Sequence, residues 1–286
     1  MDSTPVVVVH GGAGDWRTGT DAGLAACVRA AEAGRLALSS GTAIDAVIAA
    51  VRVLEDDPAL NAGTGAVLTS DGTLELDACV MDGATMRSGA VACLPPFHHP
   101  IDVAREVMED GHYHLLVADG ASRFAVERGF TPAAPDSMIL DERRAEILSP
   151  QPGTHAGNTV GAVALDGQGR LAAATSTGGI AGTRPGRVGD SPIVGGGTYA
   201  NHQGACSCTG DGESFARACA ALSVVEAAGA DPQAAAAQAL QTVQSDFGGV
   251  GGLILVTNAG NVGVARTMQL MPHAISRAGE DATAGC

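Results

Sequence analysis

Two threonines that lie 18 residues apart are expected to meet at one end of a β-hairpin. Residues 160–165 and 171–174 are short apolar runs, and residues 166–169 between them read Asp-Gly-Gln-Gly. This is the pattern of two strands joined by a tight turn. If the turn is centred in that segment, antiparallel pairing places Thr177 within about one residue of facing Thr159. Two hydroxyls would then lie together at the open end of the hairpin.

More polar groups follow the second strand. Arg187 and Asp190 come first, and a glycine-rich segment at residues 209–213, Thr-Gly-Asp-Gly-Glu, comes next and is predicted to be a turn. A site that cleaves amide bonds requires groups of these kinds: hydroxyls, a guanidinium, a carboxylate and free backbone N–H groups.

A threonine hydroxyl is a poor nucleophile unless a base lies beside it, and the motif has no neighbouring histidine or lysine. One economical base is the α-amino group of the same residue, whose pKa lies near ~8. Thr159 must then become an N-terminus, so we expect the chain to be cut between Asn158 and Thr159. Attack of the Thr159 hydroxyl on the preceding carbonyl would give an ester, and hydrolysis of this ester would free the amine. Residues 1–158 and 159–286 would then be two subunits of one domain, with a linker at about residues 141–158.

Eight segments, distributed through nearly the whole chain, keep the order found in one enzyme family. They are residues 6–14, 54–58, 61–63, 76–78, 81–83, 159–166, 186–192 and 248–253. Any one of them would be a weak signal, but together they are specific, and they resemble the plant-type (type 2) L-asparaginases, or isoaspartyl aminopeptidases, among the N-terminal-nucleophile hydrolases. The resemblance implies an α+β fold, the αββα sandwich, in which two stacked, mainly antiparallel sheets lie between helical layers. It also implies an amidohydrolase that releases L-aspartate from L-asparagine or from β-aspartyl dipeptides.

The resemblance assigns roles to the catalytic residues. Thr159 would be the nucleophile and, through its amine, the base, while Thr177 would hydrogen-bond to it and tune it. The Thr209 hydroxyl and the Gly210 N–H would form the oxyanion hole, where the loss of one donor costs about 10²–10³ in rate.

The resemblance also assigns the residues that bind the substrate. Arg187 would hold its α-carboxylate in a bidentate contact, which lysine could not imitate. Asp190 would bind the α-ammonium, and Gly212 would contribute to the substrate turn. Asp211 lies in the same turn and could strengthen the preference for an ammonium group.

Other positions are assigned around the site. Asn61 would lie near the nucleophile, and Gly11 and Gly12 belong to the glycine loop that flanks the cleavage site. Residues 54–64 resemble a loop that wraps a sodium ion with backbone carbonyls. The candidate ligands are Leu54, Glu55, Asp57, Leu60, Ala62 and Thr64. No cofactor is expected for the chemistry itself, and the expected assembly is a homodimer of cleaved α–β heterodimers.

Two features depart from the family. Asn158 stands where glycine usually precedes the nucleophile, and the linker is short. Glycine adopts strained backbone conformations at low cost, but asparagine tolerates left-handed conformations better than most residues. We therefore expect self-cleavage, at a reduced rate.

Composition narrows the possible partners and cofactors. The formal charge of −15 argues against binding to nucleic acid or to anionic membranes. The same negative charge would repel an aspartyl substrate, so a positive group within the site must attract it. Arg187 is the candidate for this group. The chain contains no lysine, which excludes Schiff-base lysine chemistry and a P-loop.

The cysteines and histidines offer only weak metal motifs. Seven cysteines form no scaffold spacing, and no secretory pattern or run of 18 apolar residues occurs, so a cytoplasmic location is expected. Cys206-x-Cys208 has no second pair at a zinc spacing. Two histidine pairs, His98-His99 and His112/His114, have no carboxylate that completes a motif.

The predicted elements favour antiparallel sheets covered by helices over βαβ units. Strands are expected at residues 6–9, 251–256 and 262–265, and a second hairpin at 65–68 and 73–76. Helices are expected at residues 21–38, 42–54, 101–109, 120–128, 213–228 and 232–243, with one or two helical turns at 141–147.

Two other interpretations remain open. The first is an uncleaved pseudoenzyme that binds amino acids without turnover, which Asn158 alone supports. The second reads residues 10–14, His-Gly-Gly-Ala-Gly, as a phosphate or dinucleotide cradle, or as the oxyanion loop of an α/β-hydrolase. Arg17 breaks the dinucleotide fingerprint, and no G-x-S-x-G motif occurs. His10 itself is more simply interpreted as a structural histidine at a strand end.

Overall fold

The computed structural model describes residues 4–14, 16, 20–148 and 159–286. Within them the chain forms two β-sheets and eight α-helices. The helices are α1 (Asp21–Leu38), α2 (Ala43–Glu55), α3 (Pro100–Asp110), α4 (Ala118–Glu127), α5 (Asp141–Leu148), α6 (Gly212–Ala218), α7 (Ala220–Ala227) and α8 (Pro232–Phe247). The strands are β1 (Val6–His10), β2 (Leu76–Asp82), β3 (Ser88–Leu94), β4 (Leu115–Val117), β5 (Val160–Leu165), β6 (Leu171–Thr177), β7 (Thr198–Ala200), β8 (Gly204–Gly210), β9 (Gly251–Thr257), β10 (Val262–Arg266), β11 (His273–Arg277) and β12 (Thr283–Gly285).

The two sheets are mainly antiparallel. The larger has eight strands in the order β12-β11-β1-β5-β6-β2-β3-β4, and the smaller has four in the order β10-β9-β8-β7. Among the paired strands, only β3 and β4 run parallel. The β5–β6 hairpin therefore lies at the centre of the large sheet, where other strands flank both of its edges.

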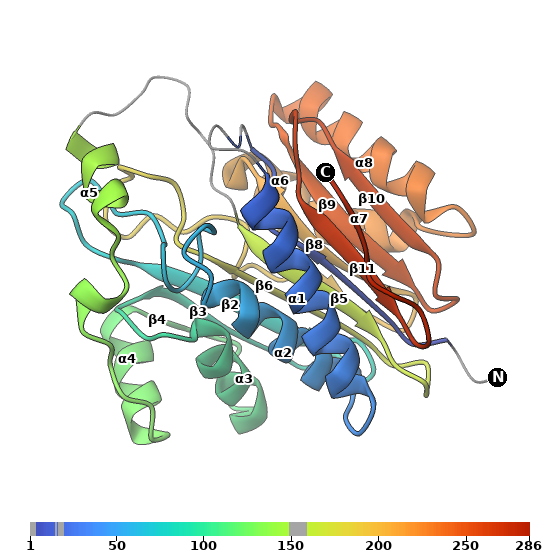
Figure 1. Cartoon of the computed structure of the whole chain (residues 1–286), viewed down its shortest axis with the longest axis horizontal. Helices are drawn as coiled ribbons and strands as arrows, with labels where there is room; N and C mark the ends of the chain where they lie inside the picture. Colours follow the sequence, from blue (N-terminus) through green and yellow to red (C-terminus); the bar gives the residue numbers. More distant parts are fainter. Residues whose placement is uncertain (1–3, 15, 17–19, 149–158) are drawn as a thin grey trace.

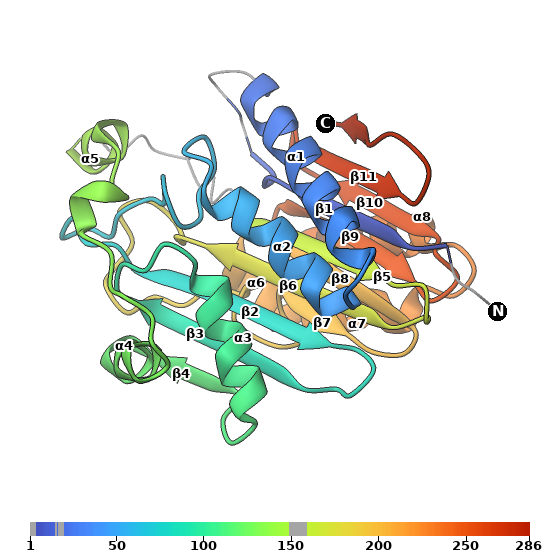
Figure 2. The ribbon, with the colours of Figure 1, turned by 60° about the horizontal axis from the view of Figure 1, so that its bottom comes forward.

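The sheets are stacked between helical layers, as Figures 1 and 2 show. Helices α1, α2 and α3 pack on one face of the large sheet, and α7 and α8 pack on the small sheet. Strands β5 and β6 contact β8 across the interface between the sheets. This arrangement confirms the predicted αββα sandwich.

Alternate residues of β5 face two different cores. Val160, Ala162 and Ala164 join the core beneath the helices, whereas Val163 and Leu165 join the core between the sheets. A strand that is buried on both faces must be apolar at successive positions. This explains why residues 160–165 form a continuous apolar run.

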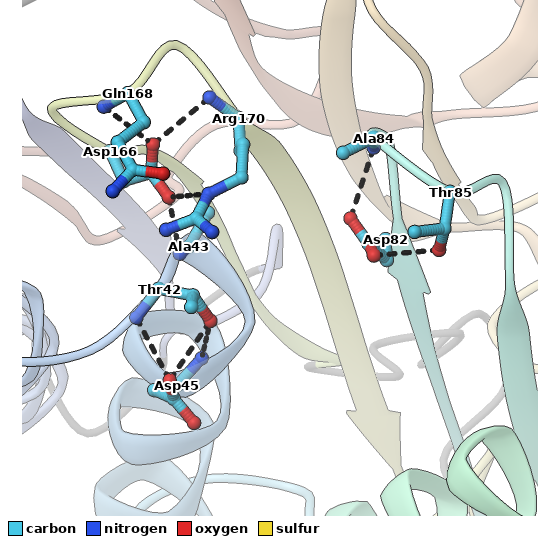
Figure 3. Close-up of polar contacts among 9 residues, drawn as sticks. All are labelled: Thr42, Ala43, Asp45, Asp82, Ala84, Thr85, Asp166, Gln168 and Arg170. Carbon is cyan, nitrogen blue, oxygen red and sulfur yellow. Dashed lines mark hydrogen bonds and ion pairs between the residues drawn. The ribbon is translucent and has the colours of Figure 1, made fainter.

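The hairpin register agrees with the sequence-based prediction. The pairing runs from Val160 opposite Ser176 to Leu165 opposite Leu171, so one further step places Thr159 opposite Thr177. At the turn, the Asp166 carboxylate accepts the N–H groups of Gln168 and Arg170 at 2.9 and 3.0 Å. It also accepts the Arg170 Nε–H at 2.7 Å and the N–H of Ala43, at the start of α2, at 3.2 Å (Figure 3). The turn is thereby tied to the helical layer.

The second predicted hairpin is wrong. Residues 65–68 and 73–75 form no strand, and β2 begins only at Leu76. The backbone groups of this segment find partners elsewhere: the Val67 N–H donates to the Asn61 side chain at 2.8 Å, and the Thr69 N–H bonds the Thr73 carbonyl at 3.0 Å across a turn. The strand in this region is β2, which lies further along the chain than expected and pairs with β3.

Most of the predicted helices are confirmed, but the one expected over residues 213–228 is divided. Cys219 has a φ of 45° and separates α6 from α7, a break that no glycine or proline marks in the sequence. Helix α2 begins with a capping box, in which Thr42 and Asp45 bond each other reciprocally (Figure 3). Of the expected linker, residues 141–148 form α5, and residues 149–158, Asn158 included, lie outside the described residues.

The described residues lack two features, a membrane-spanning helix and a cluster of metal ligands. None of the helices there is long and apolar enough to cross a membrane. In the same residues, no group of three or more histidines, cysteines, aspartates or glutamates could hold a metal ion.

Candidate active site

A small pocket lies at the open end of the β5–β6 hairpin. It is lined by Thr159, Thr177, Gly179, Ile180, Arg187, Gly189, Asp190, Ser191 and Gly210. Five of the residues predicted from the sequence therefore meet in one place, although they come from the open end of the hairpin, the loop between β6 and β7, and the end of β8 in the second sheet.

The two threonines are in direct contact. Thr159 is 5% exposed, and its hydroxyl donates to the Thr177 Oγ1 at 3.1 Å. Thr177 also accepts the N–H of Gly179 at 3.0 Å. Because the Thr159 proton points toward Thr177, the lone pairs of its oxygen are free to face the pocket.

Asn61 supports this end of the hairpin from behind. Its Nδ2 donates to the Gly179 carbonyl at 2.8 Å, and its backbone carbonyl accepts the Gly178 N–H at 3.0 Å. A Cβ on Gly178 would come within 2.6 Å of the Asn61 Oδ1. Asn61 thus holds the turn that follows Thr177, and among the described residues no hydrogen bond joins it to Thr159.

Asp190 presents a buried carboxylate to the pocket. The residue is 3% exposed, and burial raises its pKa to about 7 although the charge of Arg187 opposes the shift. Its Oδ2 is buried and has no hydrogen-bond partner among the described residues. A carboxylate in this state favours a cationic partner that would restore its charged form.

Gly212 leaves space for the two charged groups. A Cβ at this position would come within 2.9 Å of the Arg187 Nη2 and 3.0 Å of the Asp190 Oδ1. The position therefore tolerates only glycine without movement of one of these side chains.

The prediction that residues 209–213 form a turn is wrong. Thr209 and Gly210 are the last residues of β8, and α6 begins directly at Gly212. Gly210 has a φ of 145° and lines the pocket. Thr209 is fully buried, and its hydroxyl accepts the Ala13 N–H at 3.2 Å. The predicted donors thus occupy a strand end, where the backbone is more rigid than in a free turn.

The glycine loop lies against this strand end. The Ala13 contact joins the loop to Thr209, the Gly11 N–H donates to the Pro272 carbonyl at 2.8 Å, and Gly12 has a φ of 101°. Gly11 and Gly12 therefore shape the loop that contacts Thr209, and of the expected cleavage site only Thr159 lies within the described residues.

The loop predicted to bind sodium is partly bonded to itself. The carbonyls of Glu55 and Asp57 accept the N–H groups of Thr64 and Leu60 at 2.8 and 3.1 Å, and the Leu54 carbonyl accepts the Asp57 N–H at 3.3 Å. Each carbonyl oxygen keeps a second lone pair. The residues therefore fit a cation only if these carbonyls accept a second partner.

The Glu55 side chain is a site feature that sequence reasoning missed. It is fully buried beneath β6, where it accepts the Ser176 hydroxyl at 2.6 Å and the Ile101 N–H at 3.1 Å. His99 faces it at 3.5 Å. Burial raises the pKa of Glu55 to about 7. In the sequence, the only sign of this buried carboxylate is an acidic residue at the end of an apolar helix.

Two more carboxylates near Arg187 were missed. Asp77 is 3% exposed, accepts the Cys93 N–H at 2.8 Å, and has its pKa raised to about 7 by burial. In the sequence, the only sign of this buried carboxylate is a charged residue within an apolar strand. Glu213 makes a bidentate ion pair with Arg187 at 2.9 and 2.8 Å. Nothing in the sequence linked these two residues, because they lie 26 positions apart on different elements.

A buried polar row joins the two sheets below the pocket. The His10 Nε2 lies 2.9 Å from the Ser207 hydroxyl, which lies 2.8 Å from Thr175, and Thr198 donates to Thr175 at 2.6 Å. Burial lowers the pKa of His10 to about 3, so its ring is neutral. This environment agrees with the interpretation of His10 as a structural histidine.

Two stacked antiparallel sheets between helical layers form the architecture of the N-terminal-nucleophile hydrolases, and the threonine pair lies where a strand of that architecture begins. A model of the asparaginase family matches residues 3–285, so the chain belongs to this family. The prediction of the family from the sequence is confirmed.

Relatives of the chain match it over nearly its full length. It is 41% identical to an isoaspartyl peptidase of Salmonella typhimurium, with 98% of this chain and 97% of the relative covered. It is 40% identical to a plant-type L-asparaginase of Pyrococcus abyssi, with 96% of each covered. The identity to an isoaspartyl peptidase/L-asparaginase of Bos taurus is 42%, over 96% of this chain and 94% of the relative.

Proposed function

We propose that the chain cuts itself between Asn158 and Thr159 and then hydrolyses the β-amide of L-asparagine, of β-aspartyl dipeptides, or of both. The observation that carries the proposal is the contact between the Thr159 and Thr177 hydroxyls in a pocket that also contains Arg187 and Asp190. The relatives that are isoaspartyl peptidases and L-asparaginases support the same reaction.

In the proposed reaction, the freed α-amine of Thr159 accepts the proton of its own hydroxyl. The oxygen attacks the β-carbonyl carbon of the substrate, and the negative charge that develops is held by the Thr209 hydroxyl and the Gly210 N–H. Thr209 already accepts an N–H from Ala13, which leaves its own proton free to donate. The leaving nitrogen takes the proton from the α-amine as its bond to carbon breaks. Water then hydrolyses the Thr159 ester and releases L-aspartate.

Substrate selection rests on the two charged groups of the pocket. Arg187 binds the α-carboxylate, and Asp190 binds the α-ammonium with the carboxylate oxygen that has no partner in the described structure. Gly212 leaves the space that both contacts need. The enzyme therefore selects a free α-amino acid end joined to a cleavable β-amide.

Three further assignments belong to this proposal. The carbonyls of Leu54, Glu55, Asp57, Leu60, Ala62 and Thr64 would hold a structural sodium ion, which supplies loop rigidity and takes no part in the reaction. The cleaved α and β subunits, residues 1–158 and 159–286, would assemble as a dimer of heterodimers. A reducing, cytoplasmic location is supported by seven cysteines that are all free thiols.

The test is intact mass and N-terminal sequencing after incubation at neutral pH, with hydrolysis assayed on the same sample. We expect two fragments, a new terminus at Thr159-Val160-Gly161, and release of aspartate. Thr159→Ala should remain whole and lose at least about 10³-fold in turnover, whereas Thr159→Ser retains a hydroxyl and should still cleave. Hydrolysis retained by Thr159→Ala would contradict the proposal, and an unbroken, inactive wild-type chain would favour a protein that only binds amino acids.

A further inference from the structure

Glu213 holds the Arg187 guanidinium along one edge. Its two carboxylate oxygens accept the Arg187 Nε–H at 2.9 Å and an Nη2–H at 2.8 Å. Arg187 carries five N–H donors in a planar group, and this side edge uses two of them. Of the remaining three, one on Nη1 and one on Nη2 form the end edge of the same plane, where a second carboxylate can bind, and the other Nη1–H points to the opposite side.

The Nη1 end of the guanidinium lies against the pocket wall. A Cβ on Gly189 would come within 2.8 Å of Nη1, and one on Gly179 within 3.8 Å. Both glycines line the pocket together with Thr159, whereas Glu213 does not. Glu213 therefore approaches the guanidinium from outside the pocket, and the free donors are on the side where a substrate would bind.

The exposure of the two side chains agrees with this geometry. The Arg187 side chain is 15% exposed and that of Glu213 is 54% exposed. Glu213 lies in the first turn of α6, next to Gly212, so a rigid element fixes its backbone. Arg187, in contrast, lies in a loop between β6 and β7. A long side chain on a loop loses much rotational freedom when it must point in one direction.

We propose that Glu213 is a positioning residue that fixes the Arg187 guanidinium, so that only its Nη1/Nη2 edge is offered to the α-carboxylate of the substrate. The inference rests on the proposed function, because it takes Arg187 as the carboxylate-binding group. The same contact admits another role, in which Glu213 occupies Arg187 until a substrate carboxylate displaces it. The two roles predict opposite changes in KM when Glu213 is removed.

The decisive experiment compares two substrates that differ only at the α-carboxylate. L-asparagine carries it, and L-aspartic acid diamide replaces it with a neutral carboxamide. For Glu213→Ala we expect KM for L-asparagine to rise about tenfold with kcat changed less than about threefold, because an unfixed guanidinium must be ordered on binding. The kcat/KM for the diamide should stay within about twofold of wild type, since that substrate makes no ion pair with Arg187.

Two variants control for general damage. Glu213→Gln keeps the side-chain volume and one acceptor oxygen, so its KM for L-asparagine should lie between those of wild type and Glu213→Ala, even if the alanine variant folds poorly. Glu109→Ala removes a partner of Arg105 at 2.7 Å on α3, away from the pocket, and should leave the kinetics unchanged. A lower KM in both Glu213 variants, or an equal loss on both substrates, would overturn the proposal.

Failure of the proposed function would be recognised separately. If processed wild-type protein does not hydrolyse L-asparagine, the proposed reaction is wrong, and the affinity for L-aspartate is measured by calorimetry instead. Weaker binding of L-aspartate to Glu213→Ala, by about tenfold, would still support the positioning role. Equal or tighter binding would overturn it.

Discussion

The two ends of the β5–β6 hairpin both present polar side chains, but they differ in how fully these are bonded. At the turn end, the Asp166 carboxylate accepts four N–H groups, from Gln168, Arg170 and Ala43 (Figure 3). At the open end, the only hydrogen bond of the Thr159 hydroxyl within the described structure is the one to Thr177. Nearby, the Asp190 Oδ2 has no partner there.

This difference in hydrogen bonding distinguishes polar groups that stabilise the fold from polar groups that can bind a ligand. A buried polar group that is fully bonded stabilises the fold, and one that is left incomplete costs free energy unless a ligand completes it. The polar groups at the turn end of the hairpin are therefore fully hydrogen-bonded, whereas those at the open end can still bind a ligand. The following predictions test whether the two ends can be altered independently.

The largest effect on turnover among these predictions is expected at Thr177. Thr177→Val keeps the shape but removes the oxygen that accepts from Thr159 and from Gly179. The nucleophile would lose its orientation, and the Gly179 N–H would lose its partner, so we expect kcat to fall about 10²-fold. Steady-state kinetics on cleaved protein checks this, and Thr177→Ser should retain most of the activity. Wild-type kcat in Thr177→Val would show that Thr177 has no part in tuning the nucleophile.

A smaller effect is expected from pH, acting through Asp190. Burial raises the pKa of this carboxyl to about 7 in the free site. Binding of an α-ammonium requires the ionised form, so KM for L-asparagine should rise as the pH falls below 7, by up to about tenfold per pH unit. Succinamate lacks the α-amino group, and its KM should not rise in this range. A flat KM for L-asparagine between pH 5 and 7 would contradict the assignment.

The same pKa has a consequence for stability with the opposite trend. Because the folded-state pKa of Asp190 lies above its ordinary value, the folded state favours the neutral form. Its contribution to stability is complete below the ordinary pKa and is lost as the pH rises through about 7. Asp77 and Glu55, whose pKa values burial also raises to about 7, act in the same direction. Stability should therefore decrease over the range in which binding improves.

The sequence predicted the hairpin register and the pairing of Thr159 with Thr177 because the position of a tight turn determines the register of the two strands that it joins. Helices with strong alanine and leucine periodicity were also predictable. The family motifs located Arg187, Asp190 and Gly210, which do line one pocket.

The other parts of the fold and of the site could not be predicted, because they depend on tertiary contacts. Strand β12 has only three residues and is largely exposed. Strand β11 alternates in burial, but its sequence, His-Ala-Ile-Ser-Arg, shows no alternation of apolar and polar residues. The expected hairpin near residue 70 did not form, because the side chain of Asn61 accepts the Val67 N–H that a strand would have used. The ion pair between Glu213 and Arg187 joins two loop-adjacent positions for which no spacing rule exists. Contacts of this kind are set by how the sheets stack.

At the turn end, the expected effect on turnover is the smallest and the effect on folding is substantial. Asp166 is 2% exposed, and Asp166→Ala would leave its three N–H partners and the Arg170 guanidinium without their acceptor. We expect the free energy of unfolding to fall by about 2–4 kcal/mol. The kcat of the folded fraction should stay within about twofold, because six residue pairs separate the turn from Thr159, a distance of roughly 20 Å.

The neighbouring β2–β3 turn supplies a matched control for that variant. Asp82 accepts the Ala84 N–H at 3.0 Å and the Thr85 hydroxyl at 2.7 Å, at the same end of the sheet (Figure 3). It is less buried than Asp166 and makes no bond to a helix, so Asp82→Ala should cost only about 0.5–1.5 kcal/mol. Chemical denaturation measures both variants. A loss of kcat in folded Asp166→Ala that Asp82→Ala does not share would show that strain at the turn reaches the nucleophile. The two ends of the hairpin would then form one coupled unit.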